Sequence, residues 1–214
     1  MDEETIIIDS NTRNEKIKNF FINNKKNLII GFSIIVFIVI GFFSFEEVKN
    51  QKKIKLANQF NITTINFKTE KKQTIIDQLI EVINANDSTY SPLALYFLID
   101  NNLIENKNEI NSLFDELINE TSLDEEIKYL IIYKKGLFNS DISTENNLLQ
   151  ILNPIINSKS IWKSHSLYLI AEYFYSKGQK QKAKEFYNQI LILSNANQDI
   201  KIESQKRLNR DFGE

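Results

Sequence analysis

The stretch YFYSKGQKQKAKEFYNQIL, residues 173–191, decides the fold because it contains the two halves of a helical hairpin. Aromatic residues precede Gly178, and the small residue Ala183 follows within a new helical pattern. Glycine readily takes the left-handed conformation that ends a helix, and small residues let two helices approach closely. The stretch therefore predicts one helix that ends near Gly178 and a second helix that packs against it.

The other packing positions of this hairpin follow from Ala183. If Ala183 is the small residue of the second helix, Ala171 and Phe174 take the small and aromatic positions of the first, and Asn195 stands where many helical repeats have proline. The predicted packing residues are Leu167, Ala171, Phe174, Gly178, Ala183, Tyr187 and Ile190. An ordinary helical hairpin with one alanine contact produces the same pattern, and this alternative stays open.

Further helix pairs are predicted upstream of this hairpin. The first helices of the pairs begin near Pro92, Leu123 and Ile161, at intervals of 31 and 38 residues, which bracket the period of about 34 residues in tetratricopeptide repeats. The earlier pairs are degenerate, with Asn106 and Asn111 where Gly and Ala are expected. The predicted fold is all-α, with one N-terminal transmembrane helix followed by a tetratricopeptide-repeat-like α-solenoid of paired antiparallel helices.

Three local signals predict helix ends. Ser91-Pro92 is typical of an N-cap followed by proline in the first turn, and Ser122-x-x-Glu125 is typical of a capping box. Pro154 is expected to stop the helix that contains NNLLQILN.

The segment LIIGFSIIVFIVIGFFSF, residues 28–45, contains 18 residues and no charge. As a helix it covers about 27 Å, close to the hydrocarbon thickness of a bilayer, so it predicts a single span that is retained. Basic residues are nearly as frequent after the segment as before it, but Lys25-Lys26 precedes it and Glu46-Glu47 follows it, which favours a cytoplasmic N-terminus. We expect a mostly flexible cytoplasmic tail over residues 1–27, in which residues 16–26 can form a short amphipathic helix on the membrane surface. After the span we expect a connecting helix over residues 46–70 and then the helical domain over residues 71–214.

The composition argues against most kinds of catalytic or cofactor site. The chain has no cysteine, one histidine and a net charge of -2, and it contains neither a GxGxxG nor a GxxxxGK motif. His165 has no co-ligands at metal-binding spacing, and Asp124-Glu125-Glu126 is explained by a helix start. We therefore expect no enzyme activity, no cofactor, no metal, no small-molecule substrate and no nucleic acid, and we interpret Lys177, Lys180, Lys182 and Lys184 as a solvated helix face.

One helix face in the last pair is a candidate protein-binding surface. Its residues recur at i, i+3, i+7, i+10 and i+11 and are His165, Tyr168, Glu172, Tyr175 and Ser176. In tetratricopeptide arrays this side of the first helix lines the concave groove, and tyrosine offers rigid contact area there. The alternative is that Tyr168 and Tyr175 pack on the preceding helix pair.

The order of these parts resembles the YfgM-like ancillary translocon subunits, over nearly the whole chain. At the residue level the resemblance rests on Tyr90 with Leu93-Ala94, on Trp162, and on Ser176-Lys177-Gly178-x-Lys180-Gln181-x-Ala183. It implies a single-pass protein of the bacterial inner membrane with a cytoplasmic N-terminus and a periplasmic domain. It further implies protein partners, namely the secretion translocon, a membrane-anchored prolyl isomerase chaperone and exported proteins that are handed to periplasmic chaperones. The alternative function is a generic repeat scaffold for another envelope complex, in outer-membrane assembly or division.

Overall fold

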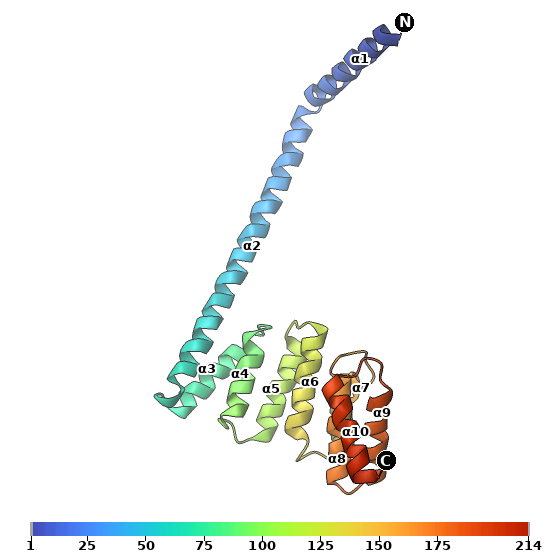
Figure 1. Cartoon of the computed structure of the whole chain (residues 1–214). Helices are drawn as coiled ribbons and strands as arrows, with labels where there is room; N and C mark the ends of the chain where they lie inside the picture. The colour runs from blue at the N-terminus through green and yellow to red at the C-terminus, as the bar shows by residue number, and fades with distance from the viewer. Residues whose placement is uncertain (1, 214) are drawn as a thin grey trace. The chain divides into compact units, whose positions relative to one another are not determined.

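The computed structural model describes residues 2–213, with side chains from Arg13 to Gly213. Over these residues the chain forms ten α-helices and one short 3₁₀ helix, and no strand (Figure 1). The predicted all-α class is therefore confirmed. The chain divides into two compact units, Met1–Lys55 and Leu56–Glu214, and the division falls inside the second helix.

The first unit contains α1 (Asp2–Asn23) and the larger part of α2 (Lys25–Ile65). The sequence predicts a mostly flexible tail in which residues 16–26 can form a short helix, whereas α1 is helical from Asp2 to Asn23. The first 27 residues contain neither glycine nor proline, so no residue in them opposes a helix strongly. Asn24 separates the two helices, and its side-chain amide donates to the carbonyl of Phe20 at 3.0 Å.

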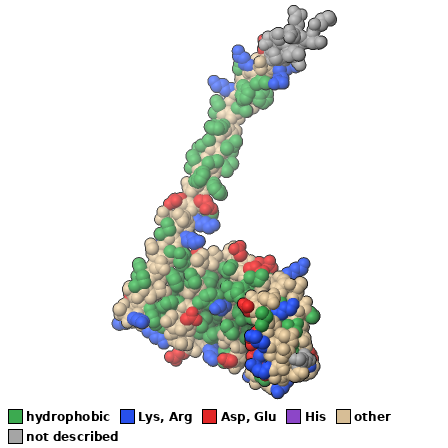
Figure 2. Space-filling view, viewed as in Figure 1, with side chains coloured by type: hydrophobic (Ala, Val, Ile, Leu, Met, Phe, Trp, Pro, Cys, Tyr) green, Lys and Arg blue, Asp and Glu red, His purple; other side chains and the backbone are tan. Residues whose placement is uncertain are grey.

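α2 contains the apolar segment that the sequence predicts to be a membrane span. It is long and apolar enough to cross a membrane, and no other helix of the described chain meets this test. Its large hydrophobic side chains are exposed, and Phe37 reaches 74%. Figure 2 shows these side chains along the helix, with basic side chains before them. A helix that is apolar and unpacked on all sides is typical of a lipid-facing segment.

The second unit contains the end of α2 and eight further helices, which pack side by side in chain order (Figure 1). After the 3₁₀ helix Asn66–Lys68 these are α3 (Lys72–Asn84), α4 (Tyr90–Asp100), α5 (Lys107–Glu120), α6 (Glu125–Asn139), α7 (Glu145–Ile156), α8 (Lys163–Ser176), α9 (Lys180–Ile192) and α10 (Gln198–Phe212). The helices α4, α6, α8 and α10 begin 35, 38 and 35 residues apart.

Hydrogen bonds that involve side chains recur at a similar interval along the second unit. Seven of the pairs are separated by 33 to 37 residues: Asn86 with Thr121, Glu126 with Ser160, Glu145 with Gln179, Glu145 with Lys182, Lys159 with Asn195, Ser164 with Asn197, and Glu172 with Arg207. Each of these bonds links one turn or helix to its counterpart about one helix pair later.

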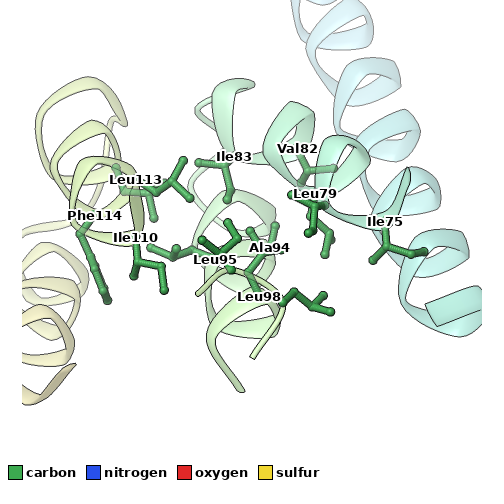
Figure 3. Packing of buried hydrophobic residues seen from close by; sticks show 14 of the residues in the cluster. Ile75, Leu79, Val82, Ile83, Ala94, Leu95, Leu98, Ile110, Leu113 and Phe114 are labelled. Atoms are coloured by element: carbon green, nitrogen blue, oxygen red, sulfur yellow. The ribbon is translucent and has the colours of Figure 1, made fainter. Parts of the chain in front are cut away.

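Two hydrophobic clusters form the core of this unit, and they meet at α6. The first cluster joins α3, α4, α5 and Ile131 of α6, and Figure 3 shows its side chains directed toward one another. The second cluster joins Ile132 of α6 to α7, α8, α9 and α10. Since Ile131 and Ile132 are adjacent, α6 presents a different side to each cluster.

The three predicted helix ends differ from the structure. Ser91 does not cap α4: it is buried and donates to the carbonyl of Val82 at 2.7 Å, while Asp87 accepts from the backbone of Tyr90. α6 begins at Glu125 after Asp124, without a side-chain cap from Ser122. Pro154 lies inside α7, which continues for two more residues to Ile156. The proline removes one helical hydrogen bond, and the packed apolar side of the helix compensates for this loss.

The two asparagines in the degenerate pair that begins near Pro92 have structural roles that differ from those of Gly and Ala. Asn106 caps α5, because its side-chain oxygen accepts from the backbone of Asn108 and Glu109. Asn111 and Asn139 exchange two amide hydrogen bonds, of 2.7 and 3.1 Å, between α5 and α6. A polar pair here replaces the close contact that an alanine would allow.

Candidate functional site

The face predicted on α8 is largely occupied by the two helices that follow it. Glu172 accepts hydrogen bonds from the hydroxyl of Tyr187 on α9 and from Arg207 on α10. The ring of Tyr168 lies 5.7 Å from that of Tyr187, and the pKa of Tyr168 is raised to about 12 by burial and by the charge of Glu172. Tyr175 packs under the guanidinium of Arg207, whose central carbon lies 4.4 Å from the ring centroid.

The two remaining residues of the predicted face lie elsewhere. His165 packs against the rings of Trp162, at 5.1 Å, and Tyr133 of α6, at 6.0 Å, and its burial lowers its pKa. Ser176 is exposed and donates to the carbonyl of Tyr173. The five residues therefore do not form one open face: Tyr168, Glu172 and Tyr175 lie against α9 and α10, while His165 and Ser176 each have other neighbours. α10 occupies the space that a bound peptide would need beside Tyr168, Glu172 and Tyr175.

The residues predicted to pack the last hairpin lie between α8 and its neighbours. Ala171 and Ala183 are both completely buried, and Gly178 has a φ of +74°, in the left-handed region that favours glycine. Tyr187 and Ile190 are completely buried too, while Leu167 and Phe174 are at most 2% exposed. Two completely buried alanines are typical of two helices that approach each other closely.

The lysines around Gly178 are engaged with neighbouring side chains. Lys182 forms an ion pair of 2.7 Å with Glu145 of α7. The ammonium groups of Lys177 and Lys180 lie 5.4 and 6.0 Å from the ring centroids of Tyr173 and Tyr175. The solvated face predicted for these lysines is therefore partly a set of contacts that hold the turn.

An apolar groove runs along α4 and α6. Near the first turns of both helices it forms a hollow of about 370 Å³, lined by Pro92, Leu93, Tyr96, Leu123, Ile127 and Leu130 among others. Near their last turns it continues as a hollow of about 280 Å³, lined by Tyr96, Ile99, Phe114, Leu137 and Phe138 and by the charged residues Asp100 and Lys134. We call these two hollows together the α4–α6 groove. Figure 2 shows hydrophobic side chains gathered over this part of the second unit.

Tyr96 borders both hollows of the α4–α6 groove. Its hydroxyl is buried and has no hydrogen-bond partner among the described residues, and burial raises its pKa to about 12. The ammonium group of Lys134 lies 5.3 Å from its ring centroid. Because no hydrogen bond holds the side chain, packing and the contact with Lys134 keep the ring between the two hollows.

The rim of the groove carries exposed apolar side chains. Leu93 of α4 is 43% exposed and Ile127 of α6 is 41% exposed. Exposed apolar side chains beside a hollow are typical of surfaces that bind apolar segments of other proteins.

Sequence reasoning missed this groove, although α4 carries a signal for it. Three residues of α4 (YSPLALYFLID) are completely buried in the core, namely Ala94, Leu95 and Leu98. The helix has further apolar residues on its remaining sides, including Leu93 and Tyr96. A helix with more apolar residues than one core face needs has a second surface to cover.

The acidic and histidine side chains form no metal site in the described part of the chain. Over residues 13–213 no group of three His, Asp or Glu side chains is arranged so that it could hold a metal ion. Glu125 accepts from the hydroxyl of Tyr129, and Glu126 accepts from Ser160 at 2.7 Å, so both serve contacts at the start of α6.

Comparison with protein-family models, with curated protein sequences and with solved structures finds no match to this chain.

Proposed function

We propose that the chain is a membrane-anchored protein-interaction module without catalytic activity, and that the α4–α6 groove binds an apolar segment of a partner protein. The observation that carries this proposal is the groove itself, two adjoining and mainly apolar hollows with exposed Leu93 and Ile127 at the rim. Exposed apolar surface beside a hollow gains free energy when a partner covers it.

A tetratricopeptide-repeat-like arrangement is part of this proposal. It is supported by helix starts 35, 38 and 35 residues apart and by hydrogen bonds that recur at 33 to 37 residues. In such arrays the first helices of successive pairs form one row, and peptides bind along that row. α4 and α6 are the first helices of two successive pairs, so the groove lies where a repeat array would hold a peptide.

The resemblance to YfgM-like subunits suggests the cellular setting. We infer a single-pass protein of the bacterial inner membrane with its N-terminus in the cytoplasm and its helical domain in the periplasm. In this setting the α4–α6 groove takes up apolar stretches of exported proteins beside the secretion translocon and a membrane-anchored prolyl isomerase chaperone. α2, with its exposed apolar side chains, supplies the anchor.

Site-specific cross-linking in cells that express the full chain tests the groove. A photoreactive amino acid at Leu93 or Ile127 is expected to capture exported proteins or translocon subunits, which mass spectrometry identifies. Ile142 is the matched control, since it is 44% exposed and lies outside the groove. Equal capture from Ile142 would reject the groove as the binding surface.

The same cross-links separate the proposed setting from the scaffold alternative. Capture of division or outer-membrane assembly proteins, without translocon subunits, would favour the scaffold. Reporter fusions to the C-terminus test the orientation independently. Activity of a cytoplasmic reporter there would contradict the periplasmic placement.

A further inference from the structure

Residues 13–27, at the end of α1 and the start of α2, combine basic and apolar side chains. The basic residues are Arg13, Lys16, Lys18, Lys25 and Lys26, and the single acidic residue among them is Glu15. All of these side chains are exposed. Exposed apolar residues accompany them, with Phe20 at 56% and Phe21 at 57%.

Three apolar residues near the end of α1 share one face. Ile17, Phe20 and Phe21 are spaced i, i+3 and i+4, and the rings of the two phenylalanines lie 5.9 Å apart. At about 100° per residue, Lys16 and Lys18 lie on either side of this face. Lysines beside an apolar face can place their stems in the boundary of a bilayer and their ammonium groups among the head groups.

The junction of α1 and α2 adds a hollow of about 830 Å³ beside this face. Its lining is apolar except near Lys25 and Asn27, and it includes Phe21, Leu28 and Phe32. Gly31 also lines it, and a Cβ atom there would meet nothing within 4 Å, so the glycine leaves the side of α2 open. A cation at one end of an apolar hollow matches a phospholipid, with its phosphate at Lys25 and an acyl chain along α2.

We propose that this junction is an interfacial binding site for anionic phospholipid. Charge complementarity selects the occupant, because residues 13–27 contain five basic side chains and only one acidic side chain. The other end of the apolar run differs, since Glu46 and Glu47 follow it and no aromatic residue comes before Phe60. The inference rests on the proposed anchoring of α2 in a membrane.

Nitroxide labels on the full chain test the site, and the absence of native cysteine makes single labels simple to place. The labelled protein is held in nanodiscs of phosphatidylcholine alone or of phosphatidylcholine mixed with phosphatidylglycerol. Phe21→Cys reports the α1 face, and Val48→Cys reports the other end of the apolar run. The label at Phe21 is expected to lie deeper in the anionic nanodisc, and the label at Val48 is expected to keep its depth.

Neutralising the lysines tests the charge. Lys16→Gln, Lys18→Gln and Lys25→Gln together should strongly reduce the dependence on phosphatidylglycerol, since each basic side chain near an anionic surface changes partitioning about fivefold. The matched control joins Lys49→Gln, Lys52→Gln and Lys53→Gln, and it should retain the dependence. An equal loss in the control, or equal depth of the Phe21 label in both nanodiscs, would overturn the proposal.

Two further measurements distinguish a lipid site from a free-phosphate site and from a failure of anchoring. Inorganic phosphate added to phosphatidylcholine nanodiscs should leave the Phe21 label in place, and a shift to its anionic-bilayer depth would show a site for free phosphate instead. A label at Phe37→Cys reports the middle of the apolar run. If that label stays in water, the anchoring proposal fails, whereas a deep Phe37 label with an unchanged Phe21 label rejects only the lipid site.

Discussion

Arg207 of α10 holds the carboxylate of Glu172 on α8 with two hydrogen bonds, from Nε to Oε1 at 2.7 Å and from Nη2 to Oε2 at 2.8 Å. Its remaining Nη1 donates to Asp211 at 2.6 Å. The Arg207 side chain is only 11% exposed, so the guanidinium is enclosed between two carboxylates and the ring of Tyr175. This relationship fixes the last helix across the face of α8.

Removing the guanidinium should destabilise the second unit. Arg207→Ala leaves Glu172 and Asp211 without their shared partner, and the loss of hydrogen bonds to charged groups predicts a fall of about 2 kcal/mol in the free energy of unfolding. Chemical denaturation of the full chain in detergent measures this. Arg210→Ala is the control, because Arg210 contacts Asp211 but is 64% exposed, and its loss should matter little. Equal effects of the two substitutions would contradict the role given to Arg207.

Acid should weaken the contacts of α9 and α10 through two carboxyl groups. The hydrogen bond from Arg210, with the charge of Arg207 nearby, lowers the pKa of Asp211, and the hydrogen bond from Lys182 lowers the pKa of Glu145. For a carboxyl whose folded-state pKa is lowered, the stabilisation is present above the unfolded value and is lost as pH falls through the folded value. We therefore expect Tm to fall as pH drops below the ordinary carboxyl range. Asp211→Asn combined with Glu145→Gln should flatten that part of the curve, and an unchanged slope would argue against both groups.

Close packing of α6 on α7 predicts a further stability effect. A Cβ atom on Gly136 would lie 2.5 Å from Cδ2 of Leu152, so the Leu152 side chain, which is completely buried, would have to shift within the core. Gly136→Ala should therefore destabilise the fold by about 1 to 2 kcal/mol, although alanine favours helix more than glycine does.

A double-mutant cycle with Leu152→Ala tests the cause of this effect. The shortened side chain makes room for the new methyl group, so the double variant should be more stable than the sum of the single effects predicts. Additive effects would show that the clash with Leu152 is not the reason.

The helices of this fold were predictable, whereas the partners of their polar residues were not. Apolar spacing and the positions of Gly178 and Ala183 define the last hairpin, because helix packing depends on local pattern and residue size. By contrast, Ser91 and Ser122 look like caps in the sequence and do not cap. Whether a serine caps a helix depends on a competing acceptor, and for Ser91 that acceptor is the carbonyl of Val82 on α3.

The predicted binding face shows a similar limit. The spacing of Tyr168, Glu172 and Tyr175 correctly places them on one side of a helix, but spacing does not reveal what covers that side. The covering residue is Arg207, 35 positions away from Glu172. The opposite holds at the α4–α6 groove, where the sequence shows more apolar residues on α4 than the core needs and the later helices leave the groove uncovered.

The groove proposal predicts that a charge at its rim weakens partner capture without unfolding the protein. Leu93→Asp or Ile127→Asp should reduce capture by about tenfold, since an apolar contact in a binding site commonly contributes more than 1 kcal/mol. Both side chains are about as exposed as Ile142, so Ile142→Asp should have a similarly small effect on stability and none on capture. Quantitative pull-down from detergent extract, together with thermal melting, separates the two properties.

The unpaired hydroxyl of Tyr96 predicts an opposite pair of effects at the same groove. Tyr96→Phe removes a buried polar atom that has no partner in the described chain, so it should raise the free energy of unfolding by about 1 kcal/mol while the groove keeps its lining. Tyr96→Ala removes the ring that borders both hollows, which should destabilise the first core cluster and join the hollows into one larger cavity. Denaturation and cross-linking from Leu93 measure both consequences. A loss of stability in Tyr96→Phe would mean that the hydroxyl has a hydrogen-bond partner, and that this hydrogen bond helps to hold the ring.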